Sequence, residues 1–261
     1  MSVITLTTDL GLKDFTVSAI KGCIYTLLPT ATIVDITHLV PKFDIMQAAF
    51  ILRNAFYHFP KGSVHIIGVM PYETENNRHI VIEYREHYFI GADNGVFSII
   101  FDEPPKNIVE LDLKLSGTEN KFLKPTKDIF TQAACHIIKG GTIEMLGNKK
   151  DGITERSMFR AIINENSIRG TIIYVDNFGN AITNIPEITY KEVGRGRSFT
   201  ISFRVPGYDI HEICDSYGQV QPSERLAVFS PTGFLEIAIN LGNASELLGL
   251  AISDVVTITF K

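Results

Sequence analysis

Short strand-like runs and helical apolar patterns alternate along the first part of the chain. Residues 3–8 (VITLTT) have the β-branched composition of a strand, and residues 14–29 place apolar side chains three and four positions apart before a proline. The same alternation returns over residues 32–69, and residues 79–101 add a hairpin-like pair of strands. Strands that alternate with helices favour βαβ units, because parallel strands need a crossover connection. The pattern therefore predicts an α/β N-terminal domain with a largely parallel sheet.

Short strands separated by turn residues dominate the chain after about residue 150. The runs are GTIIYVD, NAITNI, SFTISFRV, RLAVFSPTG, FLEIAIN and VVTITF. Regular spacing of this kind favours a compact all-β domain. We expect the α/β domain over residues 1–152, a linker over residues 153–166 and an all-β, barrel-like domain over residues 167–261.

Composition and charge narrow the class of protein. The chain has 261 residues, of which 45% are hydrophobic, and this is typical of a globular protein with an ample core. Its formal net charge of −5 leaves no broad basic face, which argues against a nucleic-acid partner. No apolar run reaches the roughly 18 residues that a membrane span needs, and the N-terminus has no basic region followed by an apolar core. We expect no membrane partner and a cytoplasmic location.

The cysteines and the one histidine–aspartate pair do not predict a metal site. Cys23, Cys135 and Cys214 lie far apart and form no C-x-x-C pair. A sparse, odd set of this kind favours a reducing compartment and buried free thiols. Asp35 and His38 in VDITH have no further ligands at a recognisable spacing, so a hydrogen-bonded pair is the better interpretation. We expect neither a metal nor a cofactor.

Two aspartates follow the first predicted strand. Asp9 comes directly after the strand residues, and Asp14 precedes the helical pattern. In open parallel sheets, ligands bind beyond the carboxyl ends of the strands. A carboxylate in this place can accept hydrogen bonds from ribose hydroxyls, bind a metal, or cap the next helix. For Asp14 the cap is the stronger interpretation, and for Asp9 binding and capping are nearly balanced.

The segment VDNFGNAITN gathers polar side chains around one aromatic ring. Asp176, Asn180 and Asn184 flank Phe178 in a strand–turn–strand context. Such a set suits recognition of an amine or a carboxylate, with a flat ring stacked on the phenyl group. Asp and Asn also favour tight turns by bonding to their own backbone. On the residues alone, an Asx-rich turn with one core phenylalanine is slightly the better explanation.

Taken together and in this order, these segments resemble one family of enzymes. The matching stretches include TTDLGLKDF, KGCIYTLLPTATIVDITH, FPKGSVHI, ADNG, YVDNFGNAITN and SPTGFLEIAINLGNASELLGL. They resemble the S-adenosyl-L-methionine (SAM) hydrolases that form adenosine, also called SAM hydroxide adenosyltransferases, and their relatives the fluorinase and chlorinase. The resemblance covers most of the chain. It implies an α/β domain, a barrel-like domain, and a homotrimer that holds SAM between one subunit's N-terminal domain and its neighbour's C-terminal domain.

The resemblance also implies a nucleoside site in which SAM is substrate or ligand and no cofactor takes part. Asp9 would bind the ribose hydroxyls, and Asp176 with Asn184 would hold the methionine amine and carboxylate. Phe178 and Asn180 would line the nucleoside pocket. With Asp14 and with two residues at the adenine edge, the expected substrate-binding set is Asp9, Asp14, Asp176, Phe178, Asn180, Asn184, Ser230 and Glu236.

The Asp-Arg-His set that is thought to organise water in the hydrolases is missing at the matching positions. Met70 stands in place of the Asp, Asn77 in place of the Arg, and Pro125 in place of the His. Methionine cannot accept a proton from water, and proline cannot replace imidazole. The sequence therefore assigns no catalytic residue. The weak candidates in the same turn are Arg78, Glu73 and Glu75.

Three functions remain open for such a chain. The first is SAM hydrolysis by substitution at the ribose C5′ carbon, with Arg78 and Glu73 or Glu75 facing that carbon. The second is a SAM- or adenosine-binding trimer without turnover, because a fold does not guarantee an activity. The third, with the least support, is attack by another nucleophile such as a halide, which needs a small dry cavity and no base.

Overall fold

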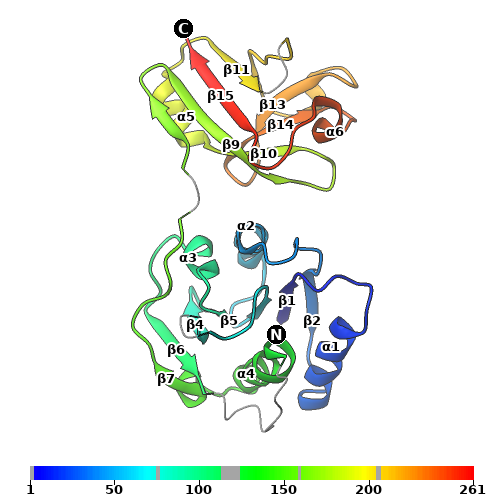
Figure 1. Ribbon diagram of the computed structural model, residues 1–261, viewed down its shortest axis with the longest axis vertical. Helices are drawn as coiled ribbons and strands as arrows, with labels where there is room; N and C mark the ends of the chain where they lie inside the picture. The colour runs from blue at the N-terminus through cyan, green and yellow to red at the C-terminus, as the bar shows by residue number, and fades with distance from the viewer. Residues whose placement is uncertain (1–2, 75–76, 113–123, 158–159, 204–206) are drawn as a thin grey trace. The chain divides into compact units, whose positions relative to one another are not determined.

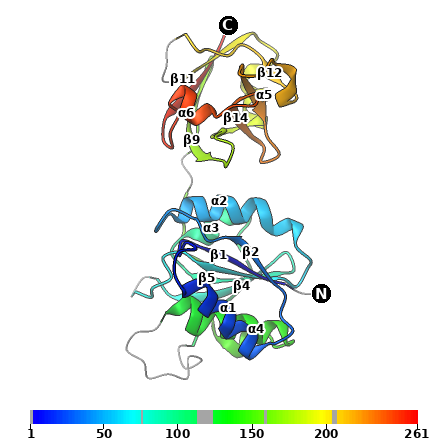
Figure 2. The ribbon, with the colours of Figure 1, turned by 90° about the vertical axis from the view of Figure 1, so that its right-hand side faces the viewer.

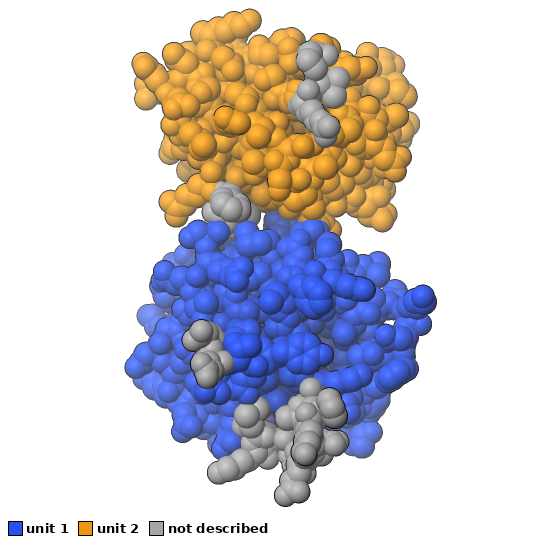
Figure 3. Space-filling model, viewed as in Figure 1, with its two compact units in different colours: residues 1–158 blue, residues 159–261 orange. Residues whose placement is uncertain are grey.

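The chain folds into two compact units. The computed structural model describes residues 3–74, 77–112, 124–157, 160–203 and 207–261. Unit 1 comprises residues 1–158 and unit 2 residues 159–261, as Figure 3 shows in two colours. Within the segment expected as a linker, the backbone N–H of Thr154 donates to Asp93 Oδ1 (2.8 Å) in unit 1. Strand β8 (Ile162–Asn164) pairs with β9 in unit 2.

Unit 1 is built on a seven-stranded mixed sheet with the strand order β2-β1-β3-β5-β4-β6-β7 (Figure 1). The first four strands of this order run parallel to one another, and β4, β6 and β7 pair antiparallel. The strands are β1 Ile4–Thr8, β2 Ile33–Thr37, β3 Val64–Gly68, β4 His79–Tyr84, β5 His87–Ala92, β6 Asn107–Leu111 and β7 Gly147–Lys149.

The expectation of a largely parallel sheet holds only for β2, β1, β3 and β5. The connection between β4 and β5 explains the difference. Arg85 and Glu86 have φ angles of 51° and 64°, and two successive positive φ angles belong to a tight two-residue hairpin turn. Such a short connection can join only antiparallel neighbours. Strand β4 therefore runs against β5, and the strands beyond it continue the antiparallel half.

Helices cover both faces of this sheet. Figures 1 and 2 show α1 and α4 on one face and α2 and α3 on the other. Because successive strand residues point to opposite faces, Leu6 packs with Ile20 and Ala133 under α1 and α4, whereas Ile67 packs with Phe97 on the opposite face. The helices are α1 Thr16–Leu27, α2 Ile45–Ala55, α3 Val96–Ile100 and α4 Thr131–Ile138, with short 3-10 helices at Phe56–His58 and Ile143–Leu146 and a π-helix at Thr126–Phe130.

Unit 2 is a curled eight-stranded sheet (Figure 1). Its order is β11-β15-β9-β10-β14-β13-β12, with β8 beside β9, and only β12 runs parallel to its neighbour. The strands are β9 Ser167–Val175, β10 Ala181–Pro186, β11 Phe199–Phe203, β12 Ile213–Cys214, β13 Arg225–Phe229, β14 Phe234–Ile239 and β15 Val255–Phe260.

The expectation of an all-β, barrel-like domain holds only in part. Among the described residues β11 and β12 do not pair with each other, so the sheet is a half-barrel with two open edges. Unit 2 also contains two short helices, α5 (Glu187–Gly194) and α6 (Ala244–Leu248), and a 3-10 helix at Tyr217–Gln219. The buried isoleucines of β9, β10 and β15 form the core of this unit.

Three properties bear on the class of protein. In the part of the chain that the structure describes, no helix is long and apolar enough to cross a membrane. The same residues hold no group of three or more His, Cys, Asp or Glu side chains arranged to bind a metal ion. The three cysteines are free thiols, with Cys135 and Cys214 buried and Cys23 half-buried.

Candidate functional site

In unit 1, Asp9 lies at the carboxyl end of β1, in the loop that leads to α1. Its Oδ2 accepts a hydrogen bond from the backbone N–H of Phe43 (2.8 Å). Phe43 has a φ of 67°, a left-handed conformation that is costly for a bulky residue, and its ring is 65% exposed. Strain of this kind and an exposed aromatic ring commonly occur at functional sites. Nothing in the sequence singles out Phe43, because neither its φ angle nor its exposure is visible without the backbone.

Asp14 has the local role that its position suggested. Its Oδ1 accepts the backbone N–H of Thr16 (2.8 Å) at the start of α1. This hydrogen bond lowers the pKa of the exposed Asp14 carboxyl. The N-cap position itself is Phe15, so Asp14 makes a local hydrogen bond one residue before the cap.

The turn between β3 and β4 carries the candidate catalytic residues. Arg78 Nη1 pairs with Glu73 Oε1 at 2.7 Å, and the Arg78 side chain is 46% exposed. The two charges neutralise each other, which leaves neither free to act on a ligand without breaking the pair. Glu75 lies outside the described residues. Met70 has a φ of 45°, and Asn94 Nδ2 donates to its carbonyl oxygen (3.4 Å) and to that of Val69 (3.1 Å).

His79 and Pro125 flank the same turn without forming an acid–base pair. His79 is buried and its Nε2 lies 2.7 Å from the carbonyl oxygen of Pro71. Its ring meets Phe130 edge-on at a centroid distance of 5.0 Å. Burial lowers the His79 pKa, so the neutral imidazole serves as a donor that holds the turn. Pro125 directly precedes the π-helix and supplies no polar side chain.

In unit 2, Asp176 organises the turn between β9 and β10. Its Oδ1 accepts the backbone N–H groups of Phe178 (2.9 Å) and Asn180 (2.8 Å), and its Oδ2 accepts Asn180 Nδ2 (3.0 Å). The Asx-rich turn favoured by the sequence is therefore present. The core phenylalanine is not, because Phe178 is 75% exposed. An aromatic ring held in solvent by a well-bonded turn is available for a ligand.

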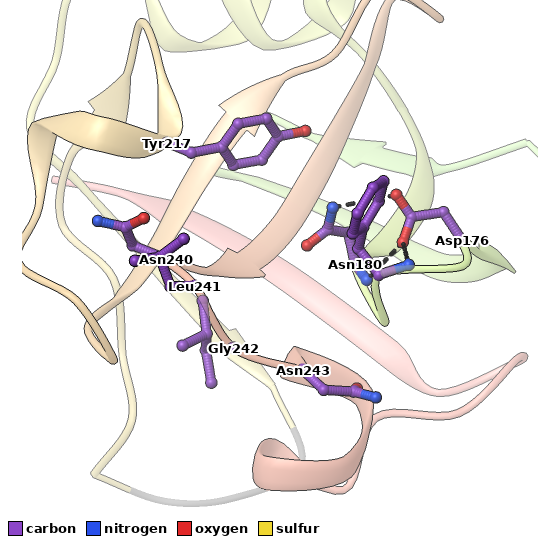
Figure 4. Close-up of a pocket in the computed structure, with 9 residues that line it drawn as sticks. Asp176, Asn180, Tyr217, Asn240, Leu241, Gly242 and Asn243 are labelled. Carbon is purple, nitrogen blue, oxygen red and sulfur yellow. Dashed lines mark hydrogen bonds between the residues drawn. The ribbon is translucent and has the colours of Figure 1, made fainter.

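A cavity of about 550 Å³ opens beside this turn (Figure 4). Tyr217 faces it from the 3-10 helix, with its hydroxyl directed toward Asp176 and Asn180. Asp176 is the one charged residue among the described residues of the lining. A volume of this size accommodates a nucleoside. The lining residues are Asp176, Phe178, Asn180, Tyr217, Ile239, Asn240, Leu241, Gly242 and Asn243.

Three expected site residues of unit 2 lie outside this lining. The buried Asn184 accepts the backbone N–H of Thr171 (2.8 Å) through Oδ1. Ser230 Oγ lies 2.7 Å from Thr232 Oγ1. Glu236 is 2% exposed, and its Oε1 accepts the hydroxyl of Tyr217 (2.6 Å). Glu236 thus reaches the cavity through Tyr217, and burial raises the pKa of its carboxyl.

Six lining residues were not expected from the sequence, namely Tyr217, Ile239, Asn240, Leu241, Gly242 and Asn243, and Tyr217 is the one aromatic residue among them. The available signal was an aromatic residue within the polar loop DSYGQ, similar to Phe178 within VDNFGN. Its partner Glu236 lies on β14, 19 positions further along the chain. A contact that depends on the curl of the sheet has no local sequence signal.

Replacing Tyr217 by phenylalanine is expected to destabilise the protein by about 1–2 kcal/mol, because the buried Glu236 carboxyl loses its hydroxyl donor. The measurement is the free energy of unfolding in urea. Tyr208→Phe is the matched control, since Tyr208 is 44% exposed against 43% for Tyr217 and its hydroxyl has no partner among the described residues. Equal stability of the two variants would contradict the prediction.

The fold, with the residues around Asp9 in unit 1 and around Asp176 in unit 2, defines a class of two-unit proteins. In this class a mixed α/β unit is followed by a curled β unit. Residues 4–147 match the model of the SAM hydroxide adenosyltransferase N-terminal domain, and residues 170–257 match that of its C-terminal domain. The chain belongs to the SAM hydroxide adenosyltransferase family. The resemblance found in the sequence is thereby confirmed.

Individual relatives agree with this assignment. The (R)-S-adenosyl-L-methionine hydrolase of Methanocaldococcus jannaschii is 30% identical, covering 100% of this chain and 97% of that protein. The hydrolase of the same name from Thermus thermophilus is 29% identical, covering 93% of each. A fluorinase from Actinoplanes matches at 20% identity, covering 98% of this chain and 97% of that protein. The crystal structure of an uncharacterized conserved protein from Thermotoga maritima has a TM-score of 0.87 at 30% identity, covering 98% of this chain and 100% of that one.

Proposed function

We propose that this protein binds SAM. The observation that carries the proposal is the 550 Å³ cavity of unit 2, where two exposed aromatic rings and one carboxylate meet in a member of this family. SAM carries a flat adenine ring, a sulfonium and an ammonium group. Aromatic faces attract both flat rings and cations, and a carboxylate attracts the ammonium. Relatives named as SAM hydrolases support the choice of ligand.

The roles of individual residues form part of this proposal. Asp9 binds the ribose hydroxyls, because its Oδ1 makes no hydrogen bond with the described residues. Asp176 attracts the methionine amine, and Phe178 and Tyr217 stack on the adenine ring. The other members of the proposed substrate-binding set are Asp14, Asn180, Asn184, Ser230 and Glu236.

The proposed reaction is slow hydrolysis of SAM to adenosine and L-methionine. Water attacks the ribose C5′, the C5′–S bond breaks, and its electron pair leaves with methionine while the water proton passes to solvent. The leaving group is already activated by its positive charge, so the protein needs mainly to position water. Met70, Asn77 and Pro125 cannot activate that water, which is why we expect a low rate.

Binding without turnover is the second candidate. It is favoured by the ion pair between Arg78 and Glu73, because both side chains, which are the candidates to replace the missing Asp-Arg-His set, already have a partner. The buried His79 is likewise committed to the carbonyl of Pro71. In this case the protein would retain the ligand and release no products.

We extend the proposal to a cytoplasmic homotrimer that uses no cofactor. Exposed apolar side chains in the loops after β1 and β2 support an assembly that would cover them. They are Leu12, Phe15, Leu39 and Phe43, with exposures of 65–72%. Free cysteines support a reducing compartment. Sedimentation equilibrium should give three times the chain mass of 29.1 kDa, and a monomer mass would contradict the trimer.

Calorimetric titration of the purified protein with SAM, adenosine and L-methionine tests the function. We expect SAM to bind more tightly than either fragment. Chromatography of the same SAM mixture then separates the two candidates. Steady release of adenosine and methionine above a protein-free control supports hydrolysis, and binding without products supports the second candidate. Absence of SAM binding would contradict both.

A further inference from the structure

The two loops that follow β1 and β2 are joined by several hydrogen bonds around Asp9. The backbone N–H of Gly11 donates to the carbonyl of His38 (2.7 Å), and that of Val40 donates to the carbonyl of Thr8 (3.3 Å). Asp9 itself accepts the N–H of Phe43. One loop carries the candidate ribose-binding carboxylate, and the other presents a donor to it.

The buried His38 side chain contacts residues of both strands that lead into these loops, Thr8 of β1 and Asp35 of β2. It is 3% exposed, and its Nδ1 lies 2.7 Å from Thr8 Oγ1. Its Nε2 lies 3.1 Å from Asp35 Oδ1, and the other oxygen of Asp35 accepts Lys21 Nζ from α1 (2.5 Å). The His38–Asp35 contact is electrostatic, since its geometry is off the line of an ideal hydrogen bond. A continuous row of polar groups thus runs from α1 to the residue before Asp9.

The donor and acceptor properties of these groups fix the direction of the hydrogen bonds in the row. The Asp35 carboxylate can only accept, so it favours the His38 tautomer with a proton on Nε2, in which Nδ1 is an acceptor. The Thr8 hydroxyl then donates to Nδ1. Its oxygen is turned toward the backbone N–H of Leu10, which lies 3.4 Å away. Through the Thr8 hydroxyl, His38 therefore constrains the peptide group that follows Asp9.

We propose that His38, acting through Thr8, is a positioning residue that aims the Asp9 carboxylate at a ribose with both hydroxyls and so sets the preference for ribonucleosides. This inference rests on the proposed function, in which Asp9 binds the ribose. A bidentate contact needs both acceptor directions to be right, and a misplacement of about 1 Å can cost as much as 100-fold. Loss of the hydrogen bond between His38 and Thr8 therefore weakens the preference for ribose over sugars that lack these hydroxyls.

The same strand offers a matched control. Thr5 Oγ1 lies 2.7 Å from His65 Nδ1, and both residues are fully buried. Thr5 and Thr8 are both on β1, but Thr5 lies three residues earlier and, because strand side chains alternate, points to the opposite face of the sheet. Thr8→Val and Thr5→Val remove the same kind of hydrogen bond with almost no change in shape. Only Thr8→Val should alter the sugar preference.

The experiment compares the Kd of adenosine with that of 2′,3′-dideoxyadenosine. We expect the wild type to prefer adenosine about 100-fold, from two hydrogen bonds to a charged group. Thr8→Val should reduce this preference about tenfold, and Thr5→Val should leave it unchanged while lowering Tm to a similar extent. Thr8→Val should change nothing further in an Asp9→Asn background, because the two residues act through one contact.

The outcomes separate this inference from the proposed function. If the wild type binds neither adenosine nor SAM, the proposed function fails and the inference with it. If the wild type prefers adenosine and Thr8→Val keeps the full preference, only the positioning role is overturned. An equal loss of preference in Thr5→Val would also overturn it, since the effect would then be a general consequence of destabilising β1.

Discussion

Replacement of Asp176 by alanine is expected to weaken SAM binding about 100-fold or more and to destabilise unit 2 by about 1–3 kcal/mol. Among the described lining residues this carboxylate is the only charge, and a charge-assisted hydrogen bond contributes about 1.5–3 kcal/mol. The same oxygens accept three hydrogen bonds within the turn. Alanine removes both contributions, so a loss of affinity alone would not show which one matters.

Asp176→Asn separates charge from turn geometry. Asparagine keeps the Oδ1 acceptor for the two backbone N–H groups, loses the Oδ2 acceptor of the Asn180 side chain, and removes the negative charge. We expect it to retain most of the stability and to lose at least tenfold in SAM affinity, measured by calorimetry. Asp254→Asn is the control, because Asp254 also accepts a backbone N–H, that of Ala251 (2.8 Å), and does not line the cavity. Wild-type affinity in Asp176→Asn would contradict the proposed contact with the amine.

Acidification from pH 7.5 to pH 5 is expected to destabilise unit 1 by about 2 kcal/mol. Burial and the neighbouring His87 lower the pKa of His65 from 6.5 to about 3. The unfolded chain therefore binds a proton below pH 6.5 that the folded chain excludes. Stability is fully present above pH 6.5 and falls as the pH drops toward 3, by about 1.4 kcal/mol for each pH unit. Over the whole window the loss amounts to roughly 4–5 kcal/mol.

The cause of this pH dependence lies in the packing around His65. Its Nδ1 is bonded to Thr5, its Nε2 lies 3.1 Å from His87 Nδ1, and the aromatic rings of Phe56 and Phe89 enclose it. The two imidazoles can be neutral donor and acceptor, whereas a second proton between them would be buried without a counter-charge.

Thermal unfolding between pH 7.5 and pH 5 tests this prediction. We expect His65→Leu to have a lower Tm at pH 7.5, because Thr5 and His87 lose a partner, and a flatter dependence of Tm on pH. His211→Gln, at an exposed histidine of unit 2, should keep the wild-type slope. A wild-type Tm that stays constant over this range would show that His65 does not control the acid sensitivity.

Features that depend on neighbouring residues could be predicted from the sequence. The apolar spacing of residues 45–55 produces α2, and Asp44 accepts the N–H of Gln47 as its cap. Asx chemistry in VDNFGN produces the turn held by Asp176. The family assignment belongs to this group too, because it depends on the order of such local motifs. Such features depend only on residues a few positions apart in the chain, so the local sequence is enough to predict them.

Features that depend on distant residues required the folded structure. The antiparallel half of the unit 1 sheet follows from the hairpin turn at Arg85 and Glu86, whose positive φ angles neither residue type suggests. The exposure of Phe178 is visible only in the folded unit 2, and the bond between Tyr217 and Glu236 joins residues 19 positions apart. The row from Lys21 to Thr8 joins a helix and two strands. Such contacts form only when tertiary packing brings separate segments together, and no local propensity encodes them.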